Sequence, residues 1–92
     1  MGFRVVEIQP TPNPNAAKLI LDRPVSAQPV SFFNAEAATD YPLAKQLFGI
    51  AGVSSLLLLG DFITINKSPD ADWDDITPQA RAILAKAEPV AT

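Results

Sequence analysis

The side chains best placed to do chemistry in this chain are four carboxylates in one short stretch, Asp70, Asp72, Asp74 and Asp75. Alternating aspartates open a calcium-binding loop, because this cation prefers oxygen ligands. Such a loop needs glycine at its sixth position and glutamate at its twelfth, but these positions hold Asp75 and Arg81. The aspartates are better explained as the start of a helix, where carboxylates stabilise exposed amides and the positive end of the dipole.

Other site chemistry is limited by residue types that the chain lacks. Its 92 residues include no cysteine and no histidine. The usual ligands of zinc, copper and iron–sulfur clusters are therefore absent, as are thiol nucleophiles, disulfides and histidine acid–base relays. The carboxylates and lysines nearest to predicted strands are Glu7, Asp22, Asp61, Lys18 and Lys67. They show no catalytic pairing, and no glycine-rich phosphate loop is present, so we predict no enzyme activity and no cofactor.

Charge and hydropathy limit the classes of partner that we expect for this chain. The net charge is -3, and the seven basic residues are scattered, so we expect no nucleic-acid surface. No apolar run approaches the roughly 20 residues that span a membrane, and the start of the chain has no signal-peptide pattern. We expect one domain over residues 1–92, with its core at about 3–87, that is monomeric and cytoplasmic.

The most distinctive segment is Thr11-Pro12-Asn13-Pro14-Asn15. Proline fixes φ at about −65°, and asparagine bonds nearby backbone amides and tolerates left-handed φ, so the segment predicts a stiff loop. Two roles are open for it. Asn13 and Asn15 could hold the loop in shape by bonding local amides, or the loop could present polar groups to a partner.

The N-terminal half predicts strands with irregular connections. Residues 3–8 and 18–22 have the composition of strands, and we expect them to pair as a hairpin around the Pro/Asn loop. Residues 23–40 are rich in proline, serine and alanine, which predicts an irregular cover with one short strand near 30–33.

The clearest hairpin joins residues 53–59 and 62–66 through Gly60-Asp61. Alternation places Leu56, Leu58, Ile63 and Ile65 on one face and Leu57, Leu59, Phe62 and Thr64 on the other. Both faces are therefore apolar near the turn. Either the segment 23–40 or a terminal tail covers the second face, or that face is a docking patch for a partner.

Two helices are predicted. The first has Asp40 as N-cap, Pro42 in its first turn, and a stop at Gly49. The second helix is expected to follow a one-turn prelude at residues 73–76. Thr77 is the expected N-cap and Pro78 the first helical residue; Glu88-Pro89 ends the helix, and Trp73 is a core anchor.

Several linked motifs resemble one known family. They are Thr11-Pro12-Asn13-Pro14-Asn15, Lys18-Leu19, residues 42–48, and residues 52–64 from Gly52-Val53 to Asp61-Phe62-Ile63-Thr64, with Trp73 and Pro78 at matching places. Over about residues 3–87 the chain closely resembles the N-terminal domain of the Nfu/NifU-like iron–sulfur scaffold proteins. At the hairpin tip the glycine is shifted by one position relative to the family pattern, which leaves the turn type open.

The resemblance implies an α+β fold, a single small domain in which a mostly antiparallel β-sheet packs against two α-helices. Family members usually hold the cluster on a second domain with a Cys-x-x-Cys pair, so scaffold activity does not transfer to a chain without cysteine. What the resemblance implies here is a non-catalytic interaction domain in iron–sulfur cluster assembly or delivery. Its partner would be a separate Cys-x-x-Cys carrier or a client apoprotein.

The candidate contact residues are Thr11, Pro12, Asn13, Pro14, Asn15, Lys18, Leu57, Leu59 and Phe62. The alternative function is a small-molecule binding or regulatory domain unrelated to iron–sulfur work. That alternative predicts a closed apolar pocket with convergent polar groups.

Overall fold

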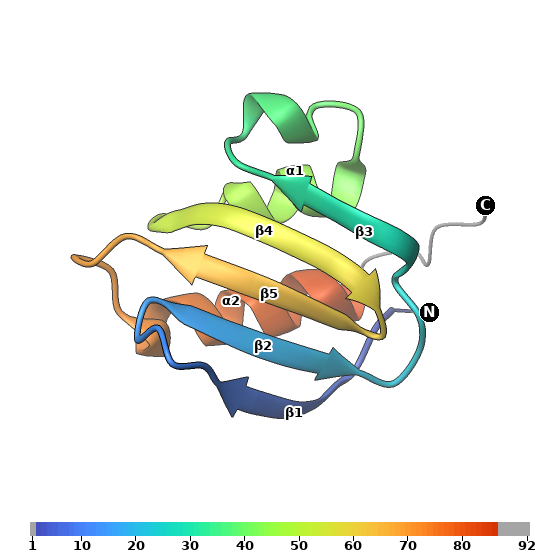
Figure 1. The fold of residues 1–92 in the computed structure, drawn as a ribbon, viewed down its shortest axis with the longest axis horizontal. Coiled ribbons are helices and arrows are strands. Elements are labelled where there is room, and N and C mark those ends of the chain that lie inside the picture. The colour runs from blue at the N-terminus through green and yellow to red at the C-terminus, as the bar shows by residue number, and fades with distance from the viewer. Residues whose placement is uncertain (1, 87–92) are drawn as a thin grey trace.

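Five antiparallel strands form one sheet, and both α-helices of the described residues lie behind it (Figure 1). The computed structural model describes residues 2–86. In chain order the elements are β1 (Val5–Pro10), β2 (Ala16–Leu21), β3 (Ser26–Phe32), a 3₁₀ helix (Glu36–Ala38), α1 (Pro42–Phe48), β4 (Val53–Gly60), β5 (Phe62–Lys67) and α2 (Trp73–Lys86). The strand order is β1-β2-β5-β4-β3. The predicted α+β fold class is confirmed.

The core lies between one face of the sheet and the two helices. Its largest fully buried side chains are Leu19, Leu56, Leu58, Ile63 and Ile65 from the strands and Leu47, Ile76 and Leu84 from the helices. Full burial of such a side chain contributes about 1.5–3 kcal/mol, so this layer supplies most of the stabilisation. The opposite face of the sheet, which we call the open face, carries no helix of the described residues (Figure 1).

The hairpin of β4 and β5 has the predicted register, with Leu59 opposite Phe62 and Leu58 opposite Ile63. Leu58 and Ile63 are fully buried, whereas Leu59 and Phe62 are half-buried on the open face. In the turn Gly60 has φ of 57°, and no described non-glycine residue has a positive φ. Glycine at the first central position with this φ is the pattern of a type II′ turn, which settles the turn geometry.

The prediction that residues 23–40 cover the second face of the sheet is wrong. The short strand predicted near 30–33 is present but longer: it is β3, an edge strand paired with β4 and followed by the 3₁₀ helix. The physical reason is that the outer edge of β4 has backbone groups that a strand satisfies and an irregular cover does not. The ladder is irregular between Ser26 and Val30, around Pro29, which has no N–H to donate. The other predicted cover, a terminal tail, lies outside the described residues.

The N-terminal hairpin of β1 and β2 forms as predicted, but β1 begins at Val5 rather than at residue 3. Residue 3 is tied to α2 instead. The Phe3 N–H donates to the carbonyl of Leu84 at 2.7 Å, which satisfies one of the last carbonyls of that helix. A Cβ atom at Gly2 would collide with the carbonyl oxygen of Ala85, so this close approach requires glycine.

Helix α1 spans the predicted residues, but its cap differs. Tyr41 is the N-cap, not Asp40, and no side chain bonds the first turn. Gly49 ends the helix as predicted, although its φ of −68° is right-handed. The positive φ falls on Gly52, at 97°, in the turn that leads to β4. The left-handed turn therefore comes three residues later than a helix-ending glycine would place it.

Helix α2 runs unbroken from Trp73, so the predicted prelude with Thr77 as N-cap and Pro78 as first residue is wrong. Asp72, the residue before the helix, bonds its first turn. The Asp72 carboxylate accepts the N–H of Asp74 at 2.9 Å, and the Asp72 carbonyl accepts the N–H groups of Asp75 and Ile76. The acidic cluster thus caps a helix, as expected. The predicted end at Glu88 lies outside the described residues.

The proline is tolerated because the apolar stripe of α2 continues across it. Ile76 precedes Pro78 and Ala80 and Leu84 follow it, and all three apolar side chains are buried against the sheet layer. A proline removes one backbone hydrogen bond and crowds the carbonyl four residues earlier. Burial of the stripe outweighs that single loss.

We predict that Pro78→Ala stabilises the domain by about 1–3 kcal/mol, because alanine restores the N–H inside the helix and removes the clash. Chemical denaturation with far-UV circular dichroism measures the free energy of unfolding. Arg81→Ala, an exposed change in the same helix, is the control and should shift stability by less than about 0.5 kcal/mol. A loss of stability in Pro78→Ala would show that the proline serves the fold.

Candidate functional site

The Pro/Asn loop is held by its own hydrogen bonds. The side-chain oxygen Oδ1 of Asn13 accepts the N–H of Asn15 at 2.9 Å. The Thr11 hydroxyl accepts the Asn13 N–H at 3.1 Å and lies 2.8 Å from the Asn13 carbonyl and 3.1 Å from that of Ala16. This is the shape-holding role predicted for Asn13. No described non-glycine residue has a positive φ, so the left-handed tolerance of asparagine is not used.

The same loop is tied to two distant elements. The Lys67 N–H donates to the carbonyl of Asn15 at 2.7 Å, and the Lys67 ammonium donates to Asn15 Oδ1 at 3.0 Å. The indole N–H of Trp73 donates to the carbonyl of Pro14 at 3.1 Å. The side chain of Asn15 therefore bonds a lysine 52 residues away rather than a local amide. We call the set Pro14, Asn15, Lys67 and Trp73 the loop tie.

Trp73 has a different position from the predicted core anchor. It is half-buried and packs on the margin of the core while its indole binds the loop. The Lys67 ammonium lies 5.8 Å from the centroid of the indole ring, within reach of a cation–π contact. The role of Lys67 was missed by sequence reasoning, and no local pattern in the sequence reveals its partners.

The open face of the sheet brings together four of the candidate contact residues. Lys18, Leu57, Leu59 and Phe62 lie there half-buried, and the Lys18 ammonium sits 4.1 Å from the centre of the Phe62 ring. Ile20, opposite Phe62 in the ladder, completes the group. Strand alternation from Lys18 was the signal that could have identified Ile20. We call these five residues the open-face patch.

The two groups of candidates occupy different parts of the molecule. The Pro/Asn loop joins β1 to β2 at the end of the sheet where β5 stops, as the pairing of Ala16 with Asn66 shows. The turn at Gly60 lies at the opposite end, with Leu59 and Phe62 beside it (Figure 1). The nine candidates therefore form two surfaces, not one continuous site.

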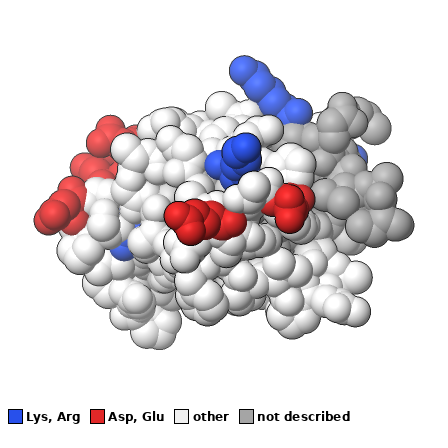
Figure 2. All heavy atoms as spheres, turned by 90° about the horizontal axis from the view of Figure 1, so that it is seen from above, with Lys and Arg blue, Asp and Glu red and all other residues white. Residues whose placement is uncertain are grey.

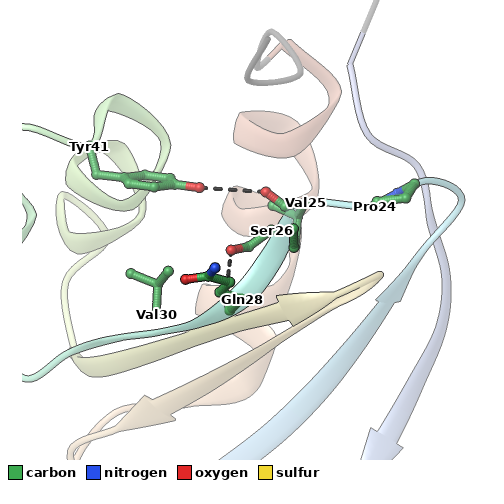
Figure 3. A pocket seen from close by; sticks show the side chains of 7 residues that line it. Pro24, Val25, Ser26, Gln28, Val30 and Tyr41 are labelled. Atoms are coloured by element: carbon green, nitrogen blue, oxygen red, sulfur yellow. Dashed lines mark hydrogen bonds between the residues drawn. The ribbon is translucent and has the colours of Figure 1, made fainter. Parts of the chain in front are cut away.

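Two hollows on the surface do not match the closed pocket with convergent polar groups that a small-molecule domain requires. One of about 430 Å³ lies between β3 and Tyr41 (Figure 3). Two of its polar groups bond the chain itself: the Tyr41 hydroxyl is 3.5 Å from the Val25 carbonyl, and the Ser26 hydroxyl donates to the Gln28 carbonyl at 2.6 Å. Burial raises the pKa of Tyr41 above its ordinary value of 10.0, so this group stays a neutral phenol.

A second hollow, of about 320 Å³, lies under the Pro/Asn loop. Its walls include Pro10, Pro14, Ala17, Trp73 and Thr77. The indole N–H that reaches this hollow is already bonded to the Pro14 carbonyl. No set of free polar groups converges in either hollow to orient a ligand.

One group of acidic side chains lies at the end of the molecule where β5 leads into α2, and other acidic side chains lie near the middle of the face seen in Figure 2. In the first group the Asp72 carboxylate bonds the first turn of α2. Within residues 2–86 no three aspartate or glutamate side chains come together in a way that could hold a metal ion. In the same part of the chain, neither α-helix has the length and apolar character needed to cross a bilayer.

Comparison with known proteins identifies the family. The profile described as scaffold protein Nfu/NifU N terminal matches residues 6–88. The chain belongs to this family. The Nfu/NifU N-terminal family is linked to iron–sulfur cluster biogenesis, and the resemblance seen in the sequence motifs is confirmed.

Two curated relatives and one solved structure show how far the similarity extends. The human mitochondrial NFU1 iron-sulfur cluster scaffold homolog is 38% identical over 84 residues, which are 89% of this chain and 33% of the relative. Conserved virulence factor C of Staphylococcus aureus is 30% identical over 88 residues, 96% of this chain and 24% of the relative. The solution structure of a NifU-like protein from Saccharomyces cerevisiae superposes with a TM-score of 0.74 at 30% identity, covering 90% of this chain and 78% of that one.

The chain therefore spans about a third or less of these curated relatives. The relative from humans is a mitochondrial protein, so the cytoplasmic location of this chain stays a prediction. Within the distinctive segment 11–15, Thr11 and Asn13 are explained by bonds within the loop, and Pro14 and Asn15 by the loop tie. A role in partner contact stays a prediction for each of the nine candidate residues.

We predict that Asn13→Ala lowers the free energy of unfolding by about 0.5–2 kcal/mol, because the Asn15 amide loses its acceptor. Urea denaturation of the variant and of Gln46→Ala, an exposed control in α1, measures the difference. Unchanged stability of Asn13→Ala would contradict the shape-holding role.

We predict that Asn15→Ala and Lys67→Met are non-additive, because each removes one side of the same hydrogen bond. In a double-mutant cycle the second change should cost at least about 0.5 kcal/mol less in the presence of the first. Strict additivity in urea denaturation would show that the Asn15–Lys67 bond does not hold the loop to β5.

Proposed function

We propose that this domain is a non-catalytic, cofactor-free interaction module that supports iron–sulfur cluster assembly or delivery. Its partner is a separate Cys-x-x-Cys carrier or a client apoprotein, and the domain itself ligates no cluster. The observation that carries the proposal is the open face of the sheet, whose apolar side chains remain only half-buried in a scaffold-family domain without cysteine or histidine.

The position of the patch favours a role in contact with a partner protein over a role in the core. Ile20, Leu57, Leu59 and Phe62 point away from the layer that α1 and α2 cover. They belong to three adjacent strands, β2, β5 and β4, so they form one contiguous surface. On a small domain, an apolar surface of this kind commonly marks a protein contact.

The edges of the sheet are poor alternatives for partner binding. In β1 the register shifts between Val5 and Glu7, and the strand ends at Pro10. In β3 the ladder is irregular before Val30, and Pro29 lies in that interval. Bulges and prolines at edges discourage the addition of another strand. Contact through the open face is therefore favoured over contact through an edge.

The absence of catalysis is part of the proposal, and the candidate acid–base residues support it. Asp22 accepts the N–H of Arg4 at 3.0 Å and lies 3.6 Å from the guanidinium of Arg23. Lys18 rests on Phe62, and Lys67 is bonded in the loop tie. Each of these groups has a structural partner, and they are dispersed over the sheet instead of facing a common cavity.

The test is an NMR titration of the ¹⁵N-labelled domain with a cluster-loaded Cys-x-x-Cys carrier. We predict shift changes centred on residues 18–20 and 57–62, because these strands present the open-face patch. Leu57→Asn should weaken binding at least about tenfold, whereas Ala82→Gln, an exposed change on the outer side of α2, should leave it unchanged.

Three results would count against the proposal. If no shift changes occur at carrier concentrations well above about 100 μM, the carrier is not a partner, since even transient binding is visible at such concentrations. Shifts confined to residues 11–15 would move the contact to the Pro/Asn loop. Hydrolysis or transfer activity of the purified domain on a small substrate would contradict its non-catalytic character.

A further inference from the structure

The open-face patch contains one cation, Lys18. Ladder pairing puts Ile20, Phe62 and Leu59 in one row across β2, β5 and β4, and Lys18 and Leu57 in the next row, on either side of Thr64. The Lys18 stem lies among these apolar residues and its ammonium lies over the Phe62 ring. Among the described strands, the register puts one other charge on this face, Glu7 on β1, whose carboxylate accepts a bond from the Gln9 side chain.

Covering this patch would remove water from the Lys18 ammonium. Within residues 2–86 Lys18 makes no salt bridge, and its ammonium lies over the Phe62 ring. A buried ammonium without an opposite charge is strongly destabilising, and the ring offsets a small part of that cost. A partner that covers Phe62 must therefore bring a carboxylate to Lys18.

The shape of the patch fits a helix. Neighbouring strands lie about 4.8 Å apart, so the row from Ile20 through Phe62 to Leu59 is about 10 Å long. Residues i and i+7 of an α-helix are separated by about 10.5 Å along its axis. A helix also supplies a layer on the face that no helix of residues 2–86 covers, whereas a strand would need one of the two irregular edges.

From these observations we infer that the open-face patch receives an amphipathic helix of a partner protein, with an acidic residue beside its apolar stripe that pairs with Lys18. This inference rests on the proposed function, because it specifies the chemistry of the partner at the same surface. The net charge of the chain is -3, so its overall field favours basic partners. Local pairing at Lys18 and the overall field therefore predict opposite preferences.

Three synthetic helical peptides distinguish these preferences. They share a leucine and phenylalanine stripe and differ only beside it, where one carries glutamate, one glutamine and one lysine. In NMR titrations up to about 1 mM, the glutamate peptide should bind at least about tenfold more tightly than the lysine peptide and should shift residues 18–20 and 57–62. Preference for the lysine or glutamine peptide, or shifts elsewhere, would overturn the inference.

Variants of Lys18 assign the effect to this side chain. Lys18→Glu should reverse the order of the peptides, and Lys18→Met, which keeps an unbranched apolar stem over Phe62, should abolish the preference for glutamate over glutamine. Lys45→Glu, an exposed charge reversal on α1, should preserve the original order. An unchanged order in folded Lys18→Glu and Lys18→Met would overturn the pairing, and sedimentation showing a dimer held by this patch would assign it to a second copy.

The same variants separate this inference from the proposed function. If the carrier binds the open face but Lys18→Glu leaves its affinity unchanged, the acidic-helix inference fails and the proposed function stands. If the glutamate peptide binds as expected and the carrier does not bind at all, the proposed function fails and the preference of the surface stands.

Discussion

The constraint on which the structure depends is that, within residues 2–86, helices cover the sheet on one side only. In strands, successive side chains point to opposite faces, so β4 and β5 must place Leu58 and Ile63 against the helices and Leu59 and Phe62 on the other side. A shift of one residue would exchange the two sets. The type II′ turn at Gly60 fixes the register and thereby decides which apolar residues belong to the core and which stay available for contact.

The loop tie solves a different problem, the anchoring of the connection between β1 and β2. Asn15 and Pro14 offer oxygen atoms at the end of the sheet where β5 stops and α2 begins, and Lys67 and Trp73 bond them from these two elements. The prolines limit the conformations that the unfolded loop can adopt, which lowers the entropy lost on folding. The most recognisable motif of the family thus has a structural reason to exist in this chain, whether or not a partner touches it.

Sequence reasoning succeeded where local chemistry decides the outcome. The hairpin register followed from alternation and the position of Gly60, and the aspartates were correctly placed at a helix start. It failed where distant parts of the chain decide. The segment 23–40 was predicted as a cover with a short strand near 30–33, but it provides the longer edge strand β3 because β4 needs a backbone partner. Helix α2 passes through Pro78 because Ile76, Ala80 and Leu84 are buried together. The bond between Asn15 and Lys67 depends on the complete sheet, and no pattern near either residue indicates it.

The two groups of candidate contact residues differ in how many of their side-chain groups remain available to a partner. In the loop, three oxygen atoms that could bind a partner already accept hydrogen bonds from within the chain. They are Asn13 Oδ1, Asn15 Oδ1 and the Pro14 carbonyl. On the open face, by contrast, the apolar side chains are incompletely buried, and Lys18 lies over an aromatic ring but forms no salt bridge within residues 2–86. A distinctive motif and an interaction surface therefore need not coincide, because a loop that satisfies its own polar groups has little left to offer a partner.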